Sequence, residues 1–433
     1  MAAYDEDTTS LAVEAARSLV VDGAPRPATL HFATTAPAYA DKTNATAIHA
    51  ALGLDAHCFA VDSVGAVRSG VGALCGAAQT AGLAVLSDIR TGLPGSADEQ
   101  SGGDGAAAFL FGDGEDVIAE FCSMASATAE FLDRWRVPGE LHSRVWEERF
   151  GAQMYAPLVR DAVGRALEAA GVTQPDRIVV SSPHARAARA TLAMFPAASH
   201  PEGLEETAGY SGAAHAGLGL ADTLDRAHAG QTILLVVASD GCDALVLRTT
   251  AALDARRAPR SVRAQLAAGR PISYSSYLTW RGLLRREAPR RPDPAMPAPP
   301  ASARREPWKF GLVGSRCRRC STAHLPPARV CVRCQAVDEM NPERFAESRA
   351  RVATFAIDHL AWSMAPPVVA AVVDFDGGGR LLCELADVDP AQVRIGTRVA
   401  MTFRRLYTAD GVHNYFWKAR PVEDEEDGEQ RHS

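Results

Sequence analysis

Two Cys-x-x-Cys pairs in the C-terminal third constrain the fold of this chain more than any other feature of its sequence. The pairs "CRRC" and "CVRC" are separated by ten residues. Two tight turns at this spacing can offer four thiolates to one tetrahedral ion. Because four thiolates fill the coordination shell, we expect Cys317, Cys320, Cys331 and Cys334 to hold a structural zinc and not a catalytic one. A redox pair is the alternative, and we interpret the intervening His324 as a loop residue.

The composition predicts a globular protein with sizeable cores. The chain has 433 residues, 47% of them hydrophobic, enough for two or three domains. It has no apolar stretch of membrane-spanning length, and "MAAYDEDTTS" has neither the basic start nor the apolar core of a signal peptide. We therefore expect a cytoplasmic protein with no membrane contact. The other five cysteines are scattered in apolar surroundings and are interpreted as buried small hydrophobes.

The charge of the chain argues against a general role in nucleic-acid binding. The formal net charge is −7, whereas nucleic-acid binders carry an excess of basic residues. Residues 255–305 are the exception, with twelve Arg residues against two acids. We interpret this segment as a solvated linker, with contact to phosphates as the alternative.

Helical and strand-like segments alternate between residues 5 and 250, which predicts a layered α/β domain. "DEDTTSLAVEAARSLV" is typical of a capped amphipathic helix, "ATLHFAT" and "TILLVVASD" of buried strands, and the stretch 140–171 of a long helix. "EAPRRPDPAMPAPPASARREP" is too rich in Pro, Ala and Arg to bury a core and predicts an extended linker. The predicted order is an α/β domain at 1–252, an Arg- and Pro-rich connecting segment at 253–305, a zinc ribbon at 306–344, an OB-type barrel at 345–423 and an acidic tail at 424–433.

Short strand-like runs after the cysteine pairs predict the small β-barrel. They are "RVATFAID", "PVVAAVVDF", "RLLCELA", "RVAMTFRRLY" and "NYFWKARP". An OB-type barrel can hold an oligonucleotide, with Trp362, Tyr415, Phe416 and Trp417 stacking on bases. Because the region is not markedly basic, we favour core or pantetheine contacts for these aromatic residues.

The ribbon and barrel sequences, with "HLPPARVCVRC" and "VVAAVVDFDGGGR", resemble the zinc-ribbon plus OB-fold family that is associated with acyl-CoA enzymes. The resemblance covers residues 306–423. It implies a thiolase-like partner enzyme and a part in receiving or channelling an acyl-CoA.

The first 250 residues resemble the thiolase superfamily, in the branch of 3-hydroxy-3-methylglutaryl-CoA synthase and the initiating ketoacyl synthases. "DEDTTSLAVEAAR", "GGDGAAAFLFG" and "GYSGAAHAGLGLADTLDRAHAGQTILLVVASDG" carry the likeness in this order. The resemblance implies a Cys nucleophile at a helix start, a His and an Asn that stabilise the developing enolate, and a Glu acid/base.

The residues at the positions that this resemblance assigns differ from the family pattern. Val67 occupies the nucleophile position, and Thr35 lies at the Glu position. The Asn position falls within residues 208–210, which contain no Asn. Only the His is retained, as His184 in "SSPHARA". The likeness also begins late, so we expect an empty position in a central sheet, filled by a partner protein or left by a misplaced start.

Two classes of function follow from this pattern. The first is an acyl-CoA-binding subunit without the Cys nucleophile, acting with an active thiolase or ketoacyl synthase in a homo- or hetero-oligomer. The second is an aldolase for β-hydroxyacyl-CoA, in which His184 polarises the thioester carbonyl and Tyr210 acts as base. Against these roles, His184 is equally a plain helix-start residue and Tyr210 a packing residue. Binding of single-stranded nucleic acid through the OB fold is a remote third class.

Overall fold

The structure, a computed structural model, describes residues 1–20, 25–287 and 294–422. The predicted acidic tail at 424–433 and residues 288–293 of the predicted connecting segment lie outside the described residues. The chain forms two compact units. The first comprises Met1–Ala2, Asp7–Thr46 and Ala56–Ser273, and the second comprises Ala3–Glu6, Ala47–Asp55 and the described residues from Tyr274 onward.

The first sheet of the first unit has the strand order β2-β1-β3-β4. Its strands are β1 (Thr29–Thr34), β2 (Phe59–Val64), β3 (Leu83–Ile89) and β4 (Asp104–Leu110). β1 pairs in parallel with both β2 and β3, and β4 runs antiparallel to β3. The described strands therefore form a continuous sheet, with no gap between β1 and its neighbours.

The second sheet of the first unit has the order β5-β10-β9-β8. Its strands are β5 (Ala119–Ala127), β8 (Arg177–Ser181), β9 (Thr232–Val237) and β10 (Cys242–Thr249). Only β8 and β9 pair in parallel. All six residues of β9 are buried, as expected for a strand that is covered on both faces.

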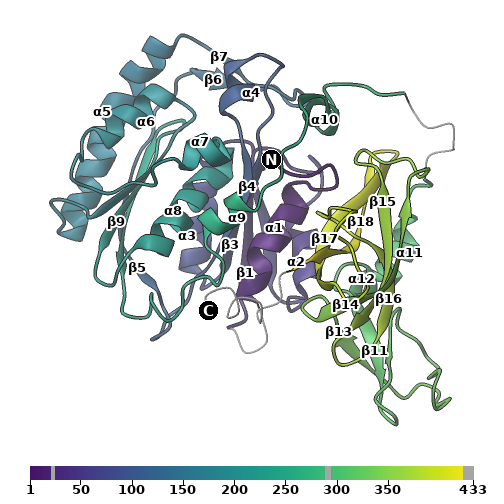
Figure 1. Cartoon of the computed structure of the whole chain (residues 1–433). Coiled ribbons are helices and arrows are strands. Elements are labelled where there is room, and N and C mark those ends of the chain that lie inside the picture. Colours follow the sequence, from purple (N-terminus) through teal and green to yellow (C-terminus); the bar gives the residue numbers. More distant parts are fainter. Residues whose placement is uncertain (21–24, 288–293, 423–433) are drawn as a thin grey trace, which may run out of the picture. The chain divides into compact units, whose positions relative to one another are not determined.

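Helices cover both faces of this second sheet and place a helical layer between the two sheets (Figure 1). Alternate residues of β9 enter two different core clusters, one shared with α3 (Ser69–Gln79) and α8 (His215–Arg226), the other with α5 (Glu148–Ala170) and α6 (Ala185–Leu192). α1 (Thr8–Ala16) packs on β3 and β4. The predicted layered α/β domain is confirmed.

Shorter elements complete the first unit. They are α4 (Ala97–Ser101), α7 (Leu204–Ala208), α9 (Val262–Ala267), β6 (Arg134–Trp135), β7 (Arg144–Val145) and the 3₁₀ turns η1 (Arg17–Leu19) and η2 (Gly212–Ala214). The helix α2 (Ala45–Leu52) begins at the end of a first-unit segment, and most of it belongs to the second unit, which includes Ala47–Asp55. The long helix predicted from residue 140 begins only at Glu148. Residues 140–147 instead follow the turn at Pro138 and Gly139 and include β7, whose Arg144 and Val145 pair with β6, so that this part of the chain is not available to the helix.

Short helices lie in and just after the predicted connecting segment. Besides α9 these are α10 (Tyr274–Trp280), α11 (Pro299–Arg304) and α12 (Glu306–Lys309). α11 and the first residues of α12 fall in the Pro-rich stretch 287–307, for which the sequence predicts an extended chain. Pro299 lies in the first turn of α11, where its missing N–H leaves no helical hydrogen bond unmade. No helix among the described residues is long and apolar enough to cross a bilayer.

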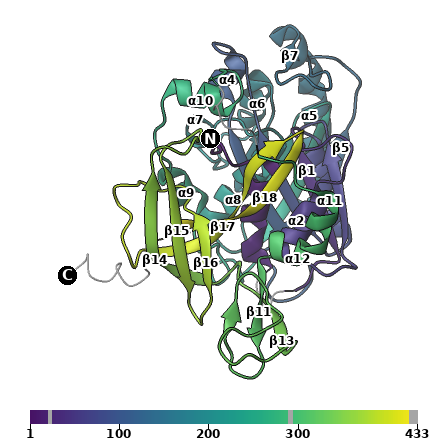
Figure 2. The same cartoon turned by 90° about the vertical axis from the view of Figure 1, so that its right-hand side faces the viewer.

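The ribbon and the barrel of the second unit have the predicted strands. The ribbon sheet has the order β12-β11-β13, and the barrel sheet has the order β16-β15-β14-β17-β18 (Figure 2). A bridge between Leu385 and Ala419 joins the end of β16 to β18 and closes the barrel. The bounds are β11 (Val313–Cys317), β12 (Ala323–His324), β13 (Met340–Arg344), β14 (Arg349–Asp358), β15 (Val368–Phe375), β16 (Arg380–Glu384), β17 (Arg398–Ala409) and β18 (Val412–Pro421).

The aromatic residues considered for base stacking separate into two groups. Tyr415 and Trp417 are buried in the barrel core, where Tyr415 stacks on Phe403 and Trp417 meets the same ring edge to face. Trp362 is exposed, and Phe416 is half-buried. Tyr415 and Trp417 thus have the core role that the composition favours and are not available to bases.

Two buried cationic side chains of the barrel form ion pairs with carboxylates near the start of the chain. Arg404 on β17 lies 3.2 Å from a carboxylate oxygen of Asp5 and 3.0 Å from one of Glu6. Lys418 on β18 lies 2.9 Å from Asp5 and 2.7 Å from Glu384. Because unpaired charges are costly in a protein interior, these pairs explain why Ala3–Glu6 belongs to the second unit.

Candidate functional site

Val67 lies in the turn between β2 and α3 and is a core residue. It is 8% exposed and belongs to the core cluster that contains Val71, Leu86 and Ala214. Cys75, two turns further along α3, contacts the Met124 sulfur at 3.3 Å, and burial raises the pKa of its thiol. The described residues therefore place an alkyl group, and no activated thiol, at the first turn of this helix.

The small residues of α3 allow another backbone segment to approach the helix. A Cβ at Gly70 would lie 2.7 Å from the carbonyl oxygen of Ala213 in η2. A side chain here would force η2 away from the helix, because real Cβ contacts are longer. The glycine at this position is therefore required for packing.

Arg68 follows Val67 and forms an ion pair that sequence reasoning missed. Its guanidinium donates two hydrogen bonds to the carboxylate of Asp243, at 2.7 and 2.9 Å, and a third to the carbonyl of Asp240 at 3.1 Å. The hydrogen bonds to Asp243 raise the pKa of Arg68. Because the partners are 175 positions apart in the sequence, no local pattern could have revealed this pair.

His184 caps α6, and both of its ring nitrogens are engaged. Nδ1 accepts a hydrogen bond from the backbone N–H of Ala187 at 3.1 Å, and Nε2 lies 2.8 Å from the carbonyl oxygen of Glu148. The two contacts fix the neutral tautomer with its proton on Nε2. The imidazole is 7% exposed, so that this geometry leaves it no nitrogen for a substrate carbonyl.

Thr35 belongs to a buried network around Asp88. Its hydroxyl lies 2.9 and 2.8 Å from the two carboxylate oxygens of Asp88, and its backbone N–H donates to the same group. The N–H of Ala213 also donates to Asp88, at 2.8 Å, and Arg90 donates to the Thr35 hydroxyl at 3.2 Å. Thr35 is therefore a hydrogen-bonding residue that links β1, β3 and η2.

Tyr210 brings a buried phenol to the edge of a cavity. Its hydroxyl oxygen faces the hydroxyl of Ser181, and within the described part of the chain neither oxygen has a hydrogen bond of good geometry. Burial raises the pKa of Tyr210 far above its ordinary value, so the phenol keeps its proton at neutral pH.

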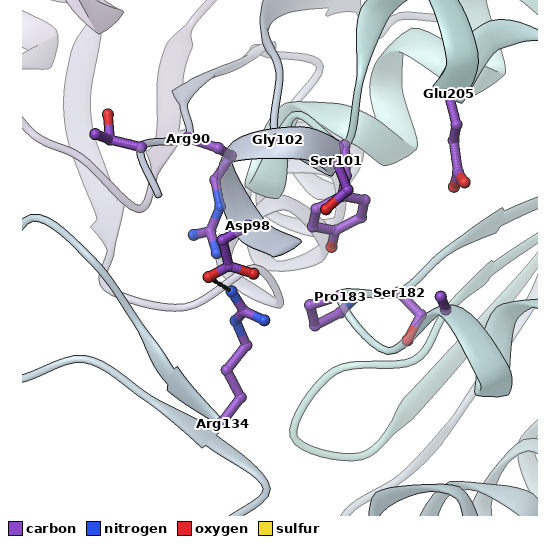
Figure 3. A pocket seen from close by; sticks show the side chains of 11 residues that line it. Arg90, Asp98, Ser101, Gly102, Arg134, Ser182, Pro183 and Glu205 are labelled. Atoms are coloured by element: carbon purple, nitrogen blue, oxygen red, sulfur yellow. Dashed lines mark hydrogen bonds and ion pairs between the residues drawn. The ribbon is translucent and has the colours of Figure 1, made fainter. Parts of the chain in front are cut away.

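The cavity has a volume of about 120 Å³ and is lined by charged groups from separate segments (Figure 3). Arg134 forms an ion pair with Asp98, and Glu205 lies 3.3 Å from the Nε2 atom of His215. The hydrogen bond from His215 lowers the pKa of Glu205. Arg90 lines the cavity as well.

Of the four sequence-predicted positions, only Tyr210 lines this cavity. The neighbours of His184 line it, but the His184 ring is turned to Glu148; Val67 and Thr35 are not among the lining residues. The charged lining residues come from positions between 90 and 205 that no motif connects.

The four cysteines of the ribbon converge as predicted. Their sulfur atoms all lie within 4.8 Å of one another, with 3.6 Å between Cys317 and Cys334 and 3.4 Å between Cys320 and Cys331. Tetrahedral zinc with bonds of about 2.3 Å separates its sulfur ligands by about 3.8 Å. The donor set therefore fits a tetrahedral thiophilic ion. His324 is buried on β12 and outside this group of ligands.

The local backbone favours the thiolate form of two of these cysteines. Hydrogen bonds from the hydroxyl and the N–H of Thr322 lower the pKa of Cys320 to about 6. The N–H of Cys334 lowers the pKa of Cys331. Both knuckles thus offer N–H groups to sulfur, which prepares the cluster for a cation.

Comparisons with known proteins agree with both parts of the fold. The hydroxymethylglutaryl-CoA synthase of Thermoplasma volcanium is 30% identical over 302 residues, which are 64% of this chain and 85% of that protein. A DUF35 domain-containing scaffold protein of Methanocaldococcus jannaschii is 29% identical over 120 residues, 27% of this chain and 84% of that protein. The family model "ChsH2, C-terminal OB-fold domain" matches residues 343–404.

Solved structures support the same fold. A crystal structure of HMG-CoA synthase complexed with CoA matches with a TM-score of 0.55 at 18% identity, over 63% of this chain and 77% of that chain. The two resemblances predicted from the sequence are thereby confirmed: a thiolase-like fold in the N-terminal part and an OB-fold domain in the C-terminal part.

Proposed function

The chain belongs to the hydroxymethylglutaryl-CoA synthase family, and from this membership we propose that it is an acyl-CoA-binding subunit that cannot form an acyl-enzyme itself. Val67 carries the proposal. It occupies the position that the resemblance assigns to the nucleophile, and its alkyl side chain cannot form a thioester. In this proposal the subunit acts in carbon–carbon bond chemistry together with an active thiolase or ketoacyl synthase.

The other family positions support the same proposal. Thr35, at the Glu position, offers no carboxylate and is hydrogen-bonded to Asp88. His184 retains its identity, but its ring nitrogens bind the backbone. Each side chain thus serves the fold, as expected for a family member whose fold is kept after its chemistry is lost.

The C-terminal module supports a role in an assembly. One similar protein is described as a scaffold protein, and one structural neighbour was solved in complex with an acetyl donor-ACP. We propose that the module, with a structural zinc held by its four cysteines, presents the acyl-CoA to a thiolase-like partner. The zinc would link the two knuckles of the ribbon and take no part in acyl transfer.

The decisive experiment weighs the intact protein after incubation with acetyl-CoA and acetoacetyl-CoA. We expect unchanged mass for the wild type, and acyl-CoA binding that is detectable by calorimetry. Val67→Cys supplies a thiol, yet it should not support condensation, because the Glu and Asn roles remain unfilled. A stable acyl adduct on any wild-type side chain of the first unit would refute the proposal, and so would the absence of acyl-CoA binding.

The buried Tyr210 hydroxyl favours one second candidate, an aldolase for β-hydroxyacyl-CoA. Cleavage breaks the bond between the α and β carbons and gives a carbonyl compound and a shorter acyl-CoA. As this bond breaks, the Tyr210 oxygen would accept the proton of the β-hydroxyl group while its own proton passes to the α-carbon, so that the phenol ends the step protonated, as it began. Chromatography of β-hydroxyacyl-CoA incubations separates the candidates: only the aldolase yields a shorter acyl-CoA, and Tyr210→Phe abolishes it.

A further inference from the structure

A groove of about 300 Å³ lies in the second unit between the helices α11 and α12 and the strands β17 and β18. Figure 2 shows α12 beside β18. Arg305, Trp308 and Lys309 line the groove from the helical side, and Leu406 and Phe416 line it from the strands. Its volume is in the range of small-molecule sites.

One part of this groove is aromatic. The rings of Trp308 and Phe416 lie with their centroids 5.3 Å apart and their planes at 58°. Both side chains are half-buried, so each retains surface that is not covered by the barrel. Aromatic faces beside an aliphatic side chain such as Leu406 suit a flat heteroaromatic ring.

The other part of the groove is cationic and has no counter-ion. Among the described residues, no carboxylate lies within 4 Å of the side-chain nitrogens of Arg305 or Lys309. Within the described residues Lys309 donates to the Ser302 hydroxyl at 3.0 Å, its Nζ atom lies 5.6 Å from the centroid of the Phe310 ring, and burial lowers the pKa of its amine. Several other arginines of this unit are paired, such as Arg316 with Glu343, Arg329 with Asp338, Arg380 with Asp374 and Arg398 with Asp376.

We propose that this groove binds the nucleotide end of coenzyme A, with the adenine ring against Trp308 and Phe416 and a phosphate group at Lys309 and Arg305. The inference rests on the proposed function, in which the chain binds acyl-CoA, and it adds where the nucleotide is held. A half-buried amine without a carboxylate gains most from an anionic ligand. A nucleotide joins that anion to a flat ring in one molecule, whereas the pantetheine arm has neither group.

Calorimetric titration of the full chain with adenosine 3′,5′-bisphosphate tests the site directly. We expect binding to the wild type and a loss of affinity of about tenfold in Lys309→Met, because one charge-assisted contact to phosphate is removed. Arg305→Met should weaken binding in the same direction, and Lys309→Arg should largely restore it. Arg304→Met is the matched control, since Arg304 belongs to α11 but not to the lining.

The outcomes distinguish this inference from the proposed function on which it rests. If CoA binds the wild type and Lys309→Met equally, the groove is not the nucleotide site, although acyl-CoA binding stands. The inference is also overturned if Arg304→Met weakens binding as much as Lys309→Met, or if a single-stranded oligonucleotide displaces the bisphosphate and binds more tightly. S-acetyl pantetheine lacks the nucleotide, so any affinity for it should be the same in wild type and Lys309→Met.

Discussion

The turn around Val67 and the four-cysteine cluster of the ribbon show opposite relations between chemistry and fold. In the proposed function Val67 stands at the position of a nucleophile, and its apolar side chain is buried in the core. In the ribbon the four thiol groups converge within 4.8 Å. Thiolates that close repel one another without a cation, so such a cluster is useful only as a complete set. Val67, by contrast, contributes to the same core cluster as α3 as a single side chain and needs no partner group.

Among the substitutions that test this comparison, loss of a ribbon cysteine should have the largest effect on folding. Cys334→Ser removes one ligand of a structural zinc, a site whose free energy of binding is about 10 kcal/mol or more and counts toward folding. We expect metal analysis to fall from about one zinc per chain to none and the ribbon to unfold. Cys122→Ser, at an exposed cysteine of β5, is the control. A well-folded ribbon without metal would show that the ribbon, like the region around Val67, does not depend on reactive groups for its fold.

Removal of the Arg68 guanidinium, next to Val67, should have the second largest effect on the free energy of unfolding. Arg68→Met leaves the carboxylate of Asp243, which is 2% exposed, without its ion-pair partner. We expect a loss of about 3 kcal/mol in the free energy of unfolding by urea, because a buried charge remains uncompensated. Arg165→Met, which breaks an exposed pair with Asp161, should be nearly neutral. Equal losses in both variants would mean that Arg68 is not part of the buried framework.

Substitution of His184 should have a moderate effect on stability and none on chemistry. His184→Ala removes the cap of α6 and the contact to Glu148, at a cost of about 1–2 kcal/mol in the free energy of unfolding. His184→Asn keeps a capping side chain and should lose less. If His184→Ala instead abolished cleavage of a β-hydroxyacyl-CoA at unchanged stability, the first unit would contain a working site.

The pH dependence of Glu205 should give the smallest effect. Its pKa in the folded state is lowered from 4.5 by the hydrogen bond with His215. The unfolded chain thus binds the proton more tightly, and the contribution of Glu205 to stability is fully present above pH 4.5. It disappears as the pH falls through the lowered pKa. Because Glu205 is half-exposed, Glu205→Gln should be only slightly less stable at pH 7, by thermal unfolding, and equal to wild type in acid. A difference that grew in acid would contradict this assignment.

The sequence alone predicted the elements whose signals are local. The five barrel strands and the two cysteine knuckles each depend on patterns within about a dozen residues, namely alternation, turn residues and Cys spacing. Local signals also misled in two places. The start of the helix predicted over 140–171 is strand β7, so α5 begins only at Glu148, and α11 formed in a segment whose Pro and Ala content had favoured an extended chain.

Only the tertiary structure decided what the predicted site residues do. The sequence shows that Val67 and His184 are present. It does not show that Val67 is buried or that both ring nitrogens of His184 are hydrogen-bonded to the backbone. Asp5 pairs with Arg404 across 399 residues of sequence, and the groove beside α11 and α12 is lined by Trp308 and Lys309 together with Leu406 and Phe416, about a hundred residues further along the chain. Such contacts depend on how the strands and helices pack, because a side chain's partner in space is not set by its neighbours in the chain.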